Sequence, residues 1–460
     1  MQTESVQVAV VGLGKIGLPL AVQYARHGKR VLGCDINPRV VERLNAGQSH
    51  IQEEAELARE VPRLVQQGLL AATTNITEAV RQSAVVVVIV PVIVDAQFEV
   101  NFAGIDATTR AIGAGLQPGT LVIYETTVPV GSTSGRFAQI LAEASALKVG
   151  QDFFLAYSPE RVSSGSLFRD LRVYPKVVGG VNAQSTTAAL SFYRSVLDAE
   201  VIEMASTDEA EFVKLIETTY RDVNIALANE FARFADARGL NVASAIAAAN
   251  TQPYSHIHTP GVGVGGHCIP VYPHFLIASL QAIQQTAAIP NMLLLPRIAR
   301  RINASMEEYA VARVEASIGS LTGRSVLILG VAYRGNVREV AFTSAQRLQE
   351  ALLVRDAFVY VDDPLFREQE LRTLGYTPLI TIEQEREISA IILQANHQAY
   401  QSLDFSRFPN CQVVLDGRQA LKRECIEALG MRYITIGDGQ YMDADNVCPE
   451  PLMSQGKSSA

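Results

Sequence analysis

The sequence lacks the cysteine spacing of a disulfide framework or a zinc site. Its five cysteines stand far apart at positions 34, 268, 411, 425 and 448, and no pair has CxxC spacing. Such a scattered set predicts a reducing, cytoplasmic environment. Runs of Lys or Arg are also missing and the formal net charge is -8, which argues against binding to nucleic acid or to anionic membranes.

Long apolar runs are missing as well. The longest, from Ala84 to Asp95, ends at an acid and is too short to span a bilayer. A β-strand is expected from about residue 6, which leaves no room for a signal peptide. The chain has 460 residues, of which 48% are hydrophobic and 19% charged. These values predict a soluble globular protein of two or three domains.

The first part of the chain alternates buried strands with amphipathic segments. Continuous apolar strands in such an alternation predict a parallel, doubly wound α/β sheet. The expected strands are 6–11, 30–35, 84–90, 120–124, 153–157 and 176–179.

A long helix is expected next, over Asp208–Arg238, because this stretch has no Gly or Pro and repeats apolar residues every three or four positions. Ser206 and Thr207 offer capping groups at its start. At 1.5 Å per residue the helix is about 45 Å long. A helix of this length favours a bridge between domains or a dimer interface, and a large core helix is the alternative.

A second α/β series follows, with strands expected at 325–330, 359–364, 390–393 and 412–416. It has only Gly330 and Gly335 after its first strand, so we expect a related fold that binds a different ligand. The predicted domains are an α/β domain at 1–205, a helical region at 206–305 and a second α/β domain at 306–445. Residues 446–460 are expected to be a disordered tail.

A glycine fingerprint follows the first strand. Gly12, Gly14 and Gly17 form GxGxxG before a helix, and Asp35 ends the next strand. In this context the glycines permit a tight turn, an approach to the pyrophosphate and close helix packing. Asp35 would accept hydrogen bonds from the ribose, which favours NAD over NADP. The prediction is a Rossmann-type NAD site, and a ligand-free tight turn is the alternative.

The segment from Gly261 to Pro270 is the most unusual stretch. Four glycines within six residues precede His267 and Cys268. A glycine loop offers backbone N–H donors and space beside a thiol, as a nucleophilic cysteine requires. A buried structural thiol fits the spacing equally well, and His267 is expected to be structural.

Three further positions are candidates for chemistry. Glu125–Pro129 and Ser158–Arg161 follow strands, where doubly wound sheets bind their ligands. Lys214 lies among apolar residues of the long helix and is a candidate base or electrostatic stabiliser. Surface or capping roles are the alternative for each.

Taken together, these stretches resemble the nucleotide-sugar 6-dehydrogenase family, which includes UDP-glucose and UDP-N-acetylhexosamine dehydrogenases. The resemblance runs from Val8 to about Arg418. Its motifs are VGLGKIGLPLA, ETTVPVGST, YSPERV, PKVVGG, KLIETTYRDVNIALANE, GVGVGGHCIP and VLDGR.

The resemblance implies a four-electron oxidation of a sugar C6 alcohol to a carboxylate with two NAD in turn. Cys268 matches the family's nucleophile, Lys214 the lysine that stabilises an oxyanion, Thr127 the threonine that positions water, and Glu160 a candidate base. Ile16 and Thr127 join the fingerprint residues as expected cofactor contacts. Other expected substrate-binding residues are Arg161, Thr218, Arg221, Asn224, Gly265, Gly266 and Arg334. The resemblance also implies a homodimer, in which 1–205 binds the cofactor, 206–305 provides dimerisation and the active site, and 306–445 binds the nucleotide sugar.

Three positions depart from the family pattern. Tyr272 stands where many members have Asp, and Thr218 where many have Asn. Ala341-Phe342-Thr343 replaces an Arg-Glu-Ser run, and Arg334 or Arg338 is the expected substitute for that anion contact.

The motifs RDVNIALANE and GGHCI favour a UDP-N-acetylhexosamine as substrate. UDP-glucose or TDP-glucose is the alternative, and a sugar-nucleotide-binding protein with impaired catalysis is an alternative of another class. A two-electron hydroxy acid dehydrogenase shares the N-terminal fold but needs no cysteine. No metal is expected, because the histidines near the glycine loop lack ligand spacing.

Overall fold

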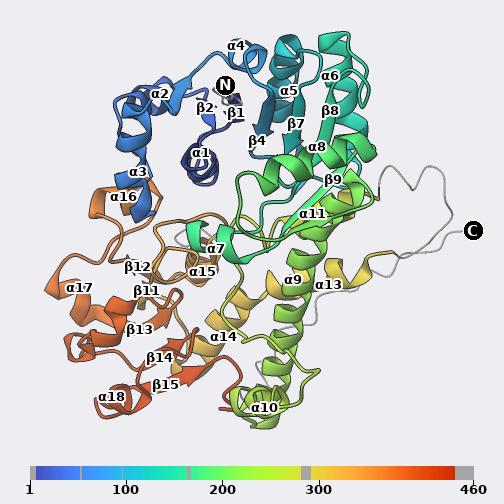
Figure 1. Cartoon of the computed structure of the whole chain (residues 1–460). Helices are drawn as coiled ribbons and strands as arrows, with labels where there is room; N and C mark the ends of the chain where they lie inside the picture. The colour runs from blue at the N-terminus through green and yellow to red at the C-terminus, as the bar shows by residue number, and fades with distance from the viewer. Residues whose placement is uncertain (1–6, 52–53, 96, 163–166, 281–291, 441–460) are drawn as a thin grey trace, which may run out of the picture. The chain divides into compact units, whose positions relative to one another are not determined.

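The computed structural model describes residues 7–51, 54–95, 97–162, 167–280 and 292–440. The chain forms two compact units. The first consists of Met1–Glu217 and His274–Pro290, and the second of Thr218–Pro273 and Asn291–Ala460. Figure 1 shows the elements of both along the chain. The expected tail at 446–460 and Val6 of the first expected strand lie outside the described residues.

The first unit is built on one sheet, whose described strands run in the order β10-β9-β8-β7-β4-β1-β2-β3. Neighbouring strands are parallel except β8 and β9, which are antiparallel. The strands are β1 (Gln7–Val11), β2 (Arg30–Cys34), β3 (Leu70–Thr73), β4 (Val85–Val88), β7 (Leu121–Tyr124), β8 (Phe154–Tyr157), β9 (Lys176–Gly180) and β10 (Val201–Glu203). A short antiparallel pair, β5 (Ile93–Val94) and β6 (Val100–Asn101), stands apart.

Helices follow most of these strands, and asparagines cap several of their starts. Asn37, Asn75 and Asn182 accept hydrogen bonds from backbone N–H groups of α2, α4 and α8. The helices are α1 (Gly17–Arg26), α2 (Pro38–Asn45), α3 (Ala55–Gln66), α4 (Ile76–Arg81), α5 (Ala103–Gly115), α6 (Ala138–Ser145), α7 (Leu167–Val173) and α8 (Ala183–Arg194), with a π-helical turn η1 at Ser132–Phe137.

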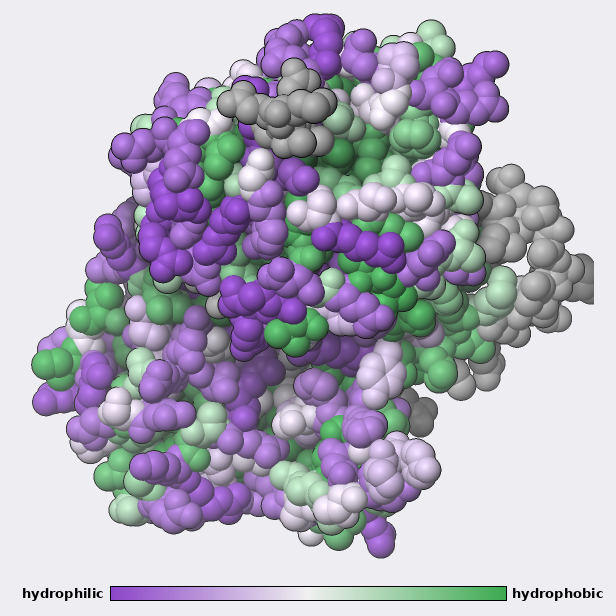
Figure 2. Space-filling view, viewed as in Figure 1, coloured by the Kyte–Doolittle hydropathy of each residue, from purple (hydrophilic) through white to green (hydrophobic). Residues whose placement is uncertain are grey.

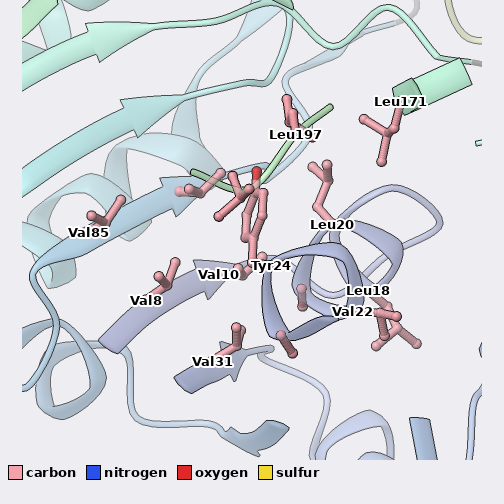
Figure 3. Close-up of a cluster of buried hydrophobic side chains, with 14 of the residues drawn as sticks. Val8, Val10, Leu18, Leu20, Val22, Tyr24, Val31, Val85, Leu171 and Leu197 are labelled. Atoms are coloured by element: carbon pink, nitrogen blue, oxygen red, sulfur yellow. The ribbon is translucent and has the colours of Figure 1, made fainter. Parts of the chain in front are cut away.

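The core of this unit lies between β1 and α1. Figure 3 shows the Tyr24 ring among apolar side chains that include Val10 of β1 and Leu20 of α1. Tyr24 is fully buried, and its hydroxyl donates a hydrogen bond to Glu125 at 3.0 Å. This core fixes the position of the glycine turn between the two elements.

The long helix α9 spans Thr207–Arg238, close to the bounds expected from the sequence. Its buried side carries three polar residues at heptad spacing, Asp222, Asn229 and Asp236, which are at most 2% exposed. Another side exposes large apolar side chains. α9 is therefore polar on part of its buried side and apolar on part of its exposed side.

The second unit contains a parallel sheet of order β12-β11-β13-β14-β15 in the described residues. Its strands are β11 (Ser325–Leu329), β12 (Phe358–Asp362), β13 (Ile388–Leu393), β14 (Val413–Asp416) and β15 (Arg432–Thr435). Its helices are α10 (Val242–Ala249), α13 (Leu294–Asn303), α14 (Met306–Ile318), α15 (Ser344–Leu353), α16 (Glu368–Thr373), α17 (Ile382–Glu387) and α18 (Arg423–Glu427), with short 3₁₀ turns η2 (Gln398–Ser402) and η3 (Phe405–Arg407). Helix α11 (Tyr272–Ala278) crosses the boundary between the units.

The α/β class is confirmed, with one correction: the sheet of the first unit is not wholly parallel, because β9 runs against β8. Strands β3, β10 and β15 went unpredicted, since each is short and lacks a continuous run of strongly apolar residues. Hydrophilic and hydrophobic side chains are mixed on the face drawn in Figure 2. None of the described helices combines the length and apolarity that crossing a bilayer demands.

Candidate functional site

The turn after β1 has the geometry of a dinucleotide-binding turn. Gly12 has a φ of +96°, and a Cβ on Gly17 would lie 1.8 Å from the carbonyl oxygen of Gly12, so both positions require glycine. A Cβ on Gly14 would meet nothing within 4 Å, which leaves the turn open there. Ile16, the N-cap of α1, makes no side-chain cap, so the helix start can face a pyrophosphate.

Asp35 lies beside this turn. Its Oδ2 accepts a hydrogen bond from the N–H of Leu13 at 3.0 Å, and its Oδ1 accepts one from the N–H of Asn37 at 2.9 Å. The side chain is only partly buried, and each carboxylate oxygen can accept a second hydrogen bond. Turn, helix start and carboxylate together fit the NAD expected from the sequence.

His50 supports the same turn, a residue that the sequence did not indicate. Its Nε2 lies 2.9 Å from the carbonyl oxygen of Leu13. Burial lowers the pKa of His50, which favours the neutral ring at pH 7.

Thr127 follows β7 in a buried segment and is 6% exposed. Residues 130–133 are held by three hydrogen bonds. The N–H of Val130 donates to Ser279 Oγ at 2.9 Å, and Glu211 accepts from the N–H groups of Gly131 and Thr133 at 2.6 and 2.8 Å. Burial raises the pKa of Glu211 to about 8. The segment that follows Thr127 is therefore anchored to Ser279 and Glu211.

Glu160 lies at the end of β8, in contact with a buried lysine. Its Oε2 is 3.3 Å from Lys176 Nζ, which also lies 2.6 Å from Glu125 Oε2. Glu125 further accepts hydrogen bonds from the hydroxyls of Tyr24 and Tyr193 at 3.0 and 2.6 Å. Lys176 is 5% exposed and Glu125 is fully buried, so this is an interior ionic network.

The charge state of Glu160 follows from this network. Burial alone would raise its pKa, but Lys176, the N–H groups of Val162 and Arg161, and Lys214 together lower it. Burial would lower the pKa of Lys176, and the two carboxylates outweigh that effect and raise it. Glu160 is therefore a carboxylate at neutral pH, as a general base must be.

Lys214 and Arg161 lie in the same unit as Glu160. Lys214 is half-buried on α9, and its charge contributes to the lowered pKa of Glu160. Arg161 pairs with Glu217 at 2.5 Å and donates to the carbonyl oxygen of Pro175 at 3.1 Å. The first unit thus gathers expected catalytic residues near the carboxyl ends of β7 and β8.

In the second unit the glycine loop packs closely against other loops. A Cβ on Gly263 would lie 2.3 Å from Glu307 Oε1, and one on Gly265 would lie 2.8 Å from Tyr333 Cβ. Gly266 donates to the carbonyl oxygen of Ala341 at 2.8 Å. At Gly263 and Gly265 these close contacts with protein atoms require glycine.

Cys268 follows this loop just before α11 and is partly exposed. Its carbonyl oxygen accepts from the N–H groups of Val271 and Tyr272 at 3.2 and 2.9 Å. Cys34 and Cys411 are buried, and burial raises the pKa of each thiol to about 12. Among the described cysteines, the accessible thiols are therefore those of Cys268 and of Cys425, which is exposed on α18.

The other expected substrate residues are spread over the second unit. Thr218 is buried and Arg221 exposed on α9, while Asn224 binds the backbone of His256 and His258 at 2.6 and 2.9 Å. Arg334 is exposed, and its Nε donates to the hydroxyl of Tyr333 at 3.2 Å.

Of the two arginines expected to replace the missing anion contact, Arg338 pairs with Glu370 and lies over the Phe366 ring at 5.1 Å. His267 pairs with Glu339, an acid close in sequence to the altered run at 341–343.

Sequence reasoning missed Lys176 and the buried polar residues Asp222, Arg300 and Asn303. The heptad spacing of Asp222, Asn229 and Asp236 on α9 was a usable signal, because polar residues in a core stripe need partners. Nothing in the sequence marked Arg300 or Asn303 as those partners.

Comparison with known proteins places the whole chain in one family. Three domain descriptions of the UDP-glucose/GDP-mannose dehydrogenase family match in succession: the NAD binding domain over residues 6–197, the central domain over 208–303 and the UDP binding domain over 327–423. These matches confirm the expected resemblance and the expected NAD cofactor.

Individual relatives agree. The chain is 32% identical over 446 residues to UDP-N-acetyl-D-mannosamine dehydrogenase of Pyrococcus horikoshii, covering 94% of this chain and 99% of the relative. It is 31% identical over 418 residues to NDP-N-acetyl-D-galactosaminuronic acid dehydrogenase of Ralstonia nicotianae, covering 89% and 95%.

Solved structures show the same similarity. The structure of the Pyrococcus horikoshii UDP-D-ManNAc dehydrogenase matches with a TM-score of 0.83 at 32% identity, covering 95% of this chain and all of that one. A UDP-glucose dehydrogenase from Pyrobaculum islandicum matches with a TM-score of 0.83 at 28% identity, covering 95% and 98%.

Proposed function

Because the chain belongs to the UDP-glucose/GDP-mannose dehydrogenase family, we propose that it oxidises the C6 alcohol of a nucleotide-linked hexose to a carboxylate, with Cys268 as covalent nucleophile. The observation that carries this proposal is the position of the accessible thiol of Cys268 behind a glycine loop, whereas Cys34 and Cys411 are buried and Cys425 is exposed on the short helix α18. A four-electron oxidation needs such a thiol, and a two-electron alcohol oxidation does not.

The proposed substrate is a UDP-N-acetylhexosamine. The relatives that are 31–32% identical are named for N-acetylated sugars, and the motifs RDVNIALANE and GGHCI favour the same class of substrate. UDP-glucose or TDP-glucose is the alternative, favoured by the similar fold of the Pyrobaculum enzyme.

The first unit would hold the cofactor. Gly12, Gly14 and the start of α1 would bind the pyrophosphate, and Asp35 the adenosine ribose. Ile16 and Thr127 would complete the contacts. When bound, NAD accepts a hydride from C6 at each of the two oxidations.

Cys268 acts between the two oxidations. Its sulfur bonds to C6 of the aldehyde, its proton leaves to a base, and the carbonyl oxygen becomes the hydroxyl of a thiohemiacetal. Loss of the second hydride and of the hydroxyl proton gives a thioester. Water then adds to the thioester carbonyl, the C–S bond breaks, and the thiolate departs from the uronic acid.

Three residues of the first unit would serve these steps. Lys214 would stabilise the negative oxygen that develops at C6. Thr127 would orient the water, and the Glu160 carboxylate, whose pKa is lowered, would take its proton. Tyr272 and Thr218 replace the family's usual Asp and Asn, so their contribution differs from that of the relatives.

The nucleotide would bind in the second unit. The expected contacts in that unit are Thr218, Arg221, Asn224, Gly265, Gly266 and Arg334. Arg161, Lys214 and Glu160, which belong to the first unit, are the remaining expected substrate contacts. We keep the domain boundaries 205, 305 and 445 as a proposal, with a cytoplasmic location.

A homodimer through α9 is part of the proposal. Soluble monomers rarely expose a continuous row of large apolar side chains, and such rows mark protein interfaces. The spacing of these residues along α9 follows helical periodicity, which places them in one stripe. The exposed residues are Phe212, Ile216, Tyr220, Leu227, Phe231 and Phe234, at 42, 46, 60, 43, 39 and 61%.

The test is the number of NADH formed per sugar with limiting UDP-GlcNAc, UDP-ManNAc, UDP-glucose and TDP-glucose. Two NADH from one of them supports the four-electron reaction and names the substrate. One NADH indicates a reaction that stops at the aldehyde. If none of the four yields NADH while NAD and a sugar nucleotide still bind, the chain is a binding protein with impaired catalysis.

A further inference from the structure

The Cys268 loop, residues 261–270, is connected at both ends by hydrogen bonds to one buried carboxylate, that of Asp222. At its start, the N–H of Gly261 donates to Asn229 Oδ1 at 3.0 Å, and Asn229 Nδ2 donates to Asn303 Oδ1 at 2.9 Å. Asn303 Nδ2 in turn donates to Asp222 Oδ1 at 2.8 Å. The chain of contacts therefore runs from the loop through α9 and α13 to Asp222.

The other end of the loop reaches the same carboxylate. Arg300 Nη1 donates to the carbonyl oxygen of Pro270 at 3.2 Å, and Arg300 Nε donates to Asp222 Oδ2 at 2.8 Å. Cys268 lies two residues before Pro270. Asp222 is thus the shared acceptor of two hydrogen-bond paths that meet the loop on either side of the thiol.

This network lies in the interior. Asp222 and Asn229 are fully buried and Asn303 is 1% exposed. Water cannot readily replace a lost hydrogen bond in the interior. Removing one partner therefore leaves the remaining polar groups buried and unsatisfied, which costs free energy. The two hydrogen-bond paths should therefore restrict the motion of the Cys268 loop.

A loop with four glycines in six residues needs such supports. Glycine loses more conformational freedom on ordering than any other residue, so the loop has little tendency to hold a single conformation by itself. Covalent catalysis requires the sulfur within reach of C6 and in line with it, and an error of about 1 Å costs about a hundredfold in rate.

We propose that Asp222, acting through Arg300, Asn303 and Asn229, is the positioning residue of the Cys268 loop. Asp222 would contact neither the sugar nor the cofactor, and it would affect the reaction only through the position of the Cys268 thiol. This inference rests on the proposed function of Cys268.

The test compares Asp222→Asn with Asp236→Asn. Asp236 is the matched control, because it lies on the same side of α9, is 2% exposed and pairs with Arg313, but it supports Gly437 and Gly439 instead of the Cys268 loop. In Asp222→Asn, backbone hydrogen exchange over 261–271 should rise about tenfold, the scale of one lost hydrogen bond. In Asp236→Asn it should stay unchanged.

Kinetics provide the second readout. Only the second oxidation uses Cys268, so in Asp222→Asn the first NADH should form at the wild-type rate and the second about a hundredfold more slowly, with KM for the sugar nucleotide unchanged. Arg300→Lys keeps the charge beside Asp222 but cannot make both contacts. The rate at which Arg300→Lys forms the second NADH should therefore lie between the rates of wild type and Arg300→Met. It also serves if Asp222→Asn fails to fold.

Equal loop exchange in Asp222→Asn and Asp236→Asn would overturn the inference, as would equal slowing of both oxidations. Wild type that forms no NADH with any sugar nucleotide would refute the proposed function, and the exchange comparison would still decide whether Asp222 holds the loop.

Discussion

Replacing Lys176 by Met should destabilise the first unit strongly. Lys176 is 5% exposed, and its ammonium lies 2.6 Å from Glu125 and 3.3 Å from Glu160, so its removal leaves the fully buried Glu125 carboxylate without its cation. Removing one partner of such a pair costs about 3–5 kcal/mol. Lys148→Met, on an exposed loop, should cost less than about 0.5 kcal/mol.

Hydrogen exchange of the amides of β8 and β9 measures this locally, because it reports the opening free energy of one unit. The double variant Glu125→Gln/Lys176→Met should recover part of the loss, since no unpaired charge remains at 125. A loss below about 1 kcal/mol in Lys176→Met, or no recovery in the double variant, would refute the reasoning that this network is held by charge.

Three further outcomes are expected. The pKa of Glu211 in the folded protein, about 8, lies above its unfolded value, so the contribution of Glu211 to stability is present at low pH and is lost as pH rises through 8. The difference in unfolding free energy between wild type and Glu211→Gln should therefore change between pH 5 and 9. A constant difference would contradict this expectation. Phe231→Glu should convert a dimer to monomer in light scattering, whereas Val354→Glu, at an 83% exposed position off α9, should not. Asp35→Ala should raise KM for NAD about tenfold and reduce discrimination against NADP, and an unchanged KM would exclude Asp35 from the cofactor site.

Much of the fold was predictable because buried parallel strands leave continuous apolar runs. The runs at 120–124 and 325–330 became β7 and β11 within one residue at each end. The antiparallel direction of β9 relative to β8 was not predictable, because the run Lys176–Gly179 does not indicate which way the strand runs in the sheet. Strand β3 was missed because Leu70–Thr73 contains two alanines and a threonine.

The candidate site was likewise predictable only in part. Local geometry such as the tight turn at Gly12 and Gly17 follows from local sequence, because only glycine fits there. The partners of Asp222 are about 80 residues away in the chain, and the partner of Glu160 lies on another strand. Such pairings depend on tertiary packing, which no periodicity in the sequence encodes.

The most direct test of the account is the mass of the peptide containing Cys268 during turnover of Glu160→Gln with NAD and the sugar nucleotide that wild type oxidises. Without the Glu160 carboxylate, water activation should slow by about 10²–10⁴, so the thioester should accumulate. This peptide should gain a mass equal to the nucleotide-linked uronyl group, and the corresponding peptide of Cys268→Ser should gain none. An unmodified Cys268 peptide while wild type forms two NADH per sugar would contradict the central claim that the oxidation passes through this thiol.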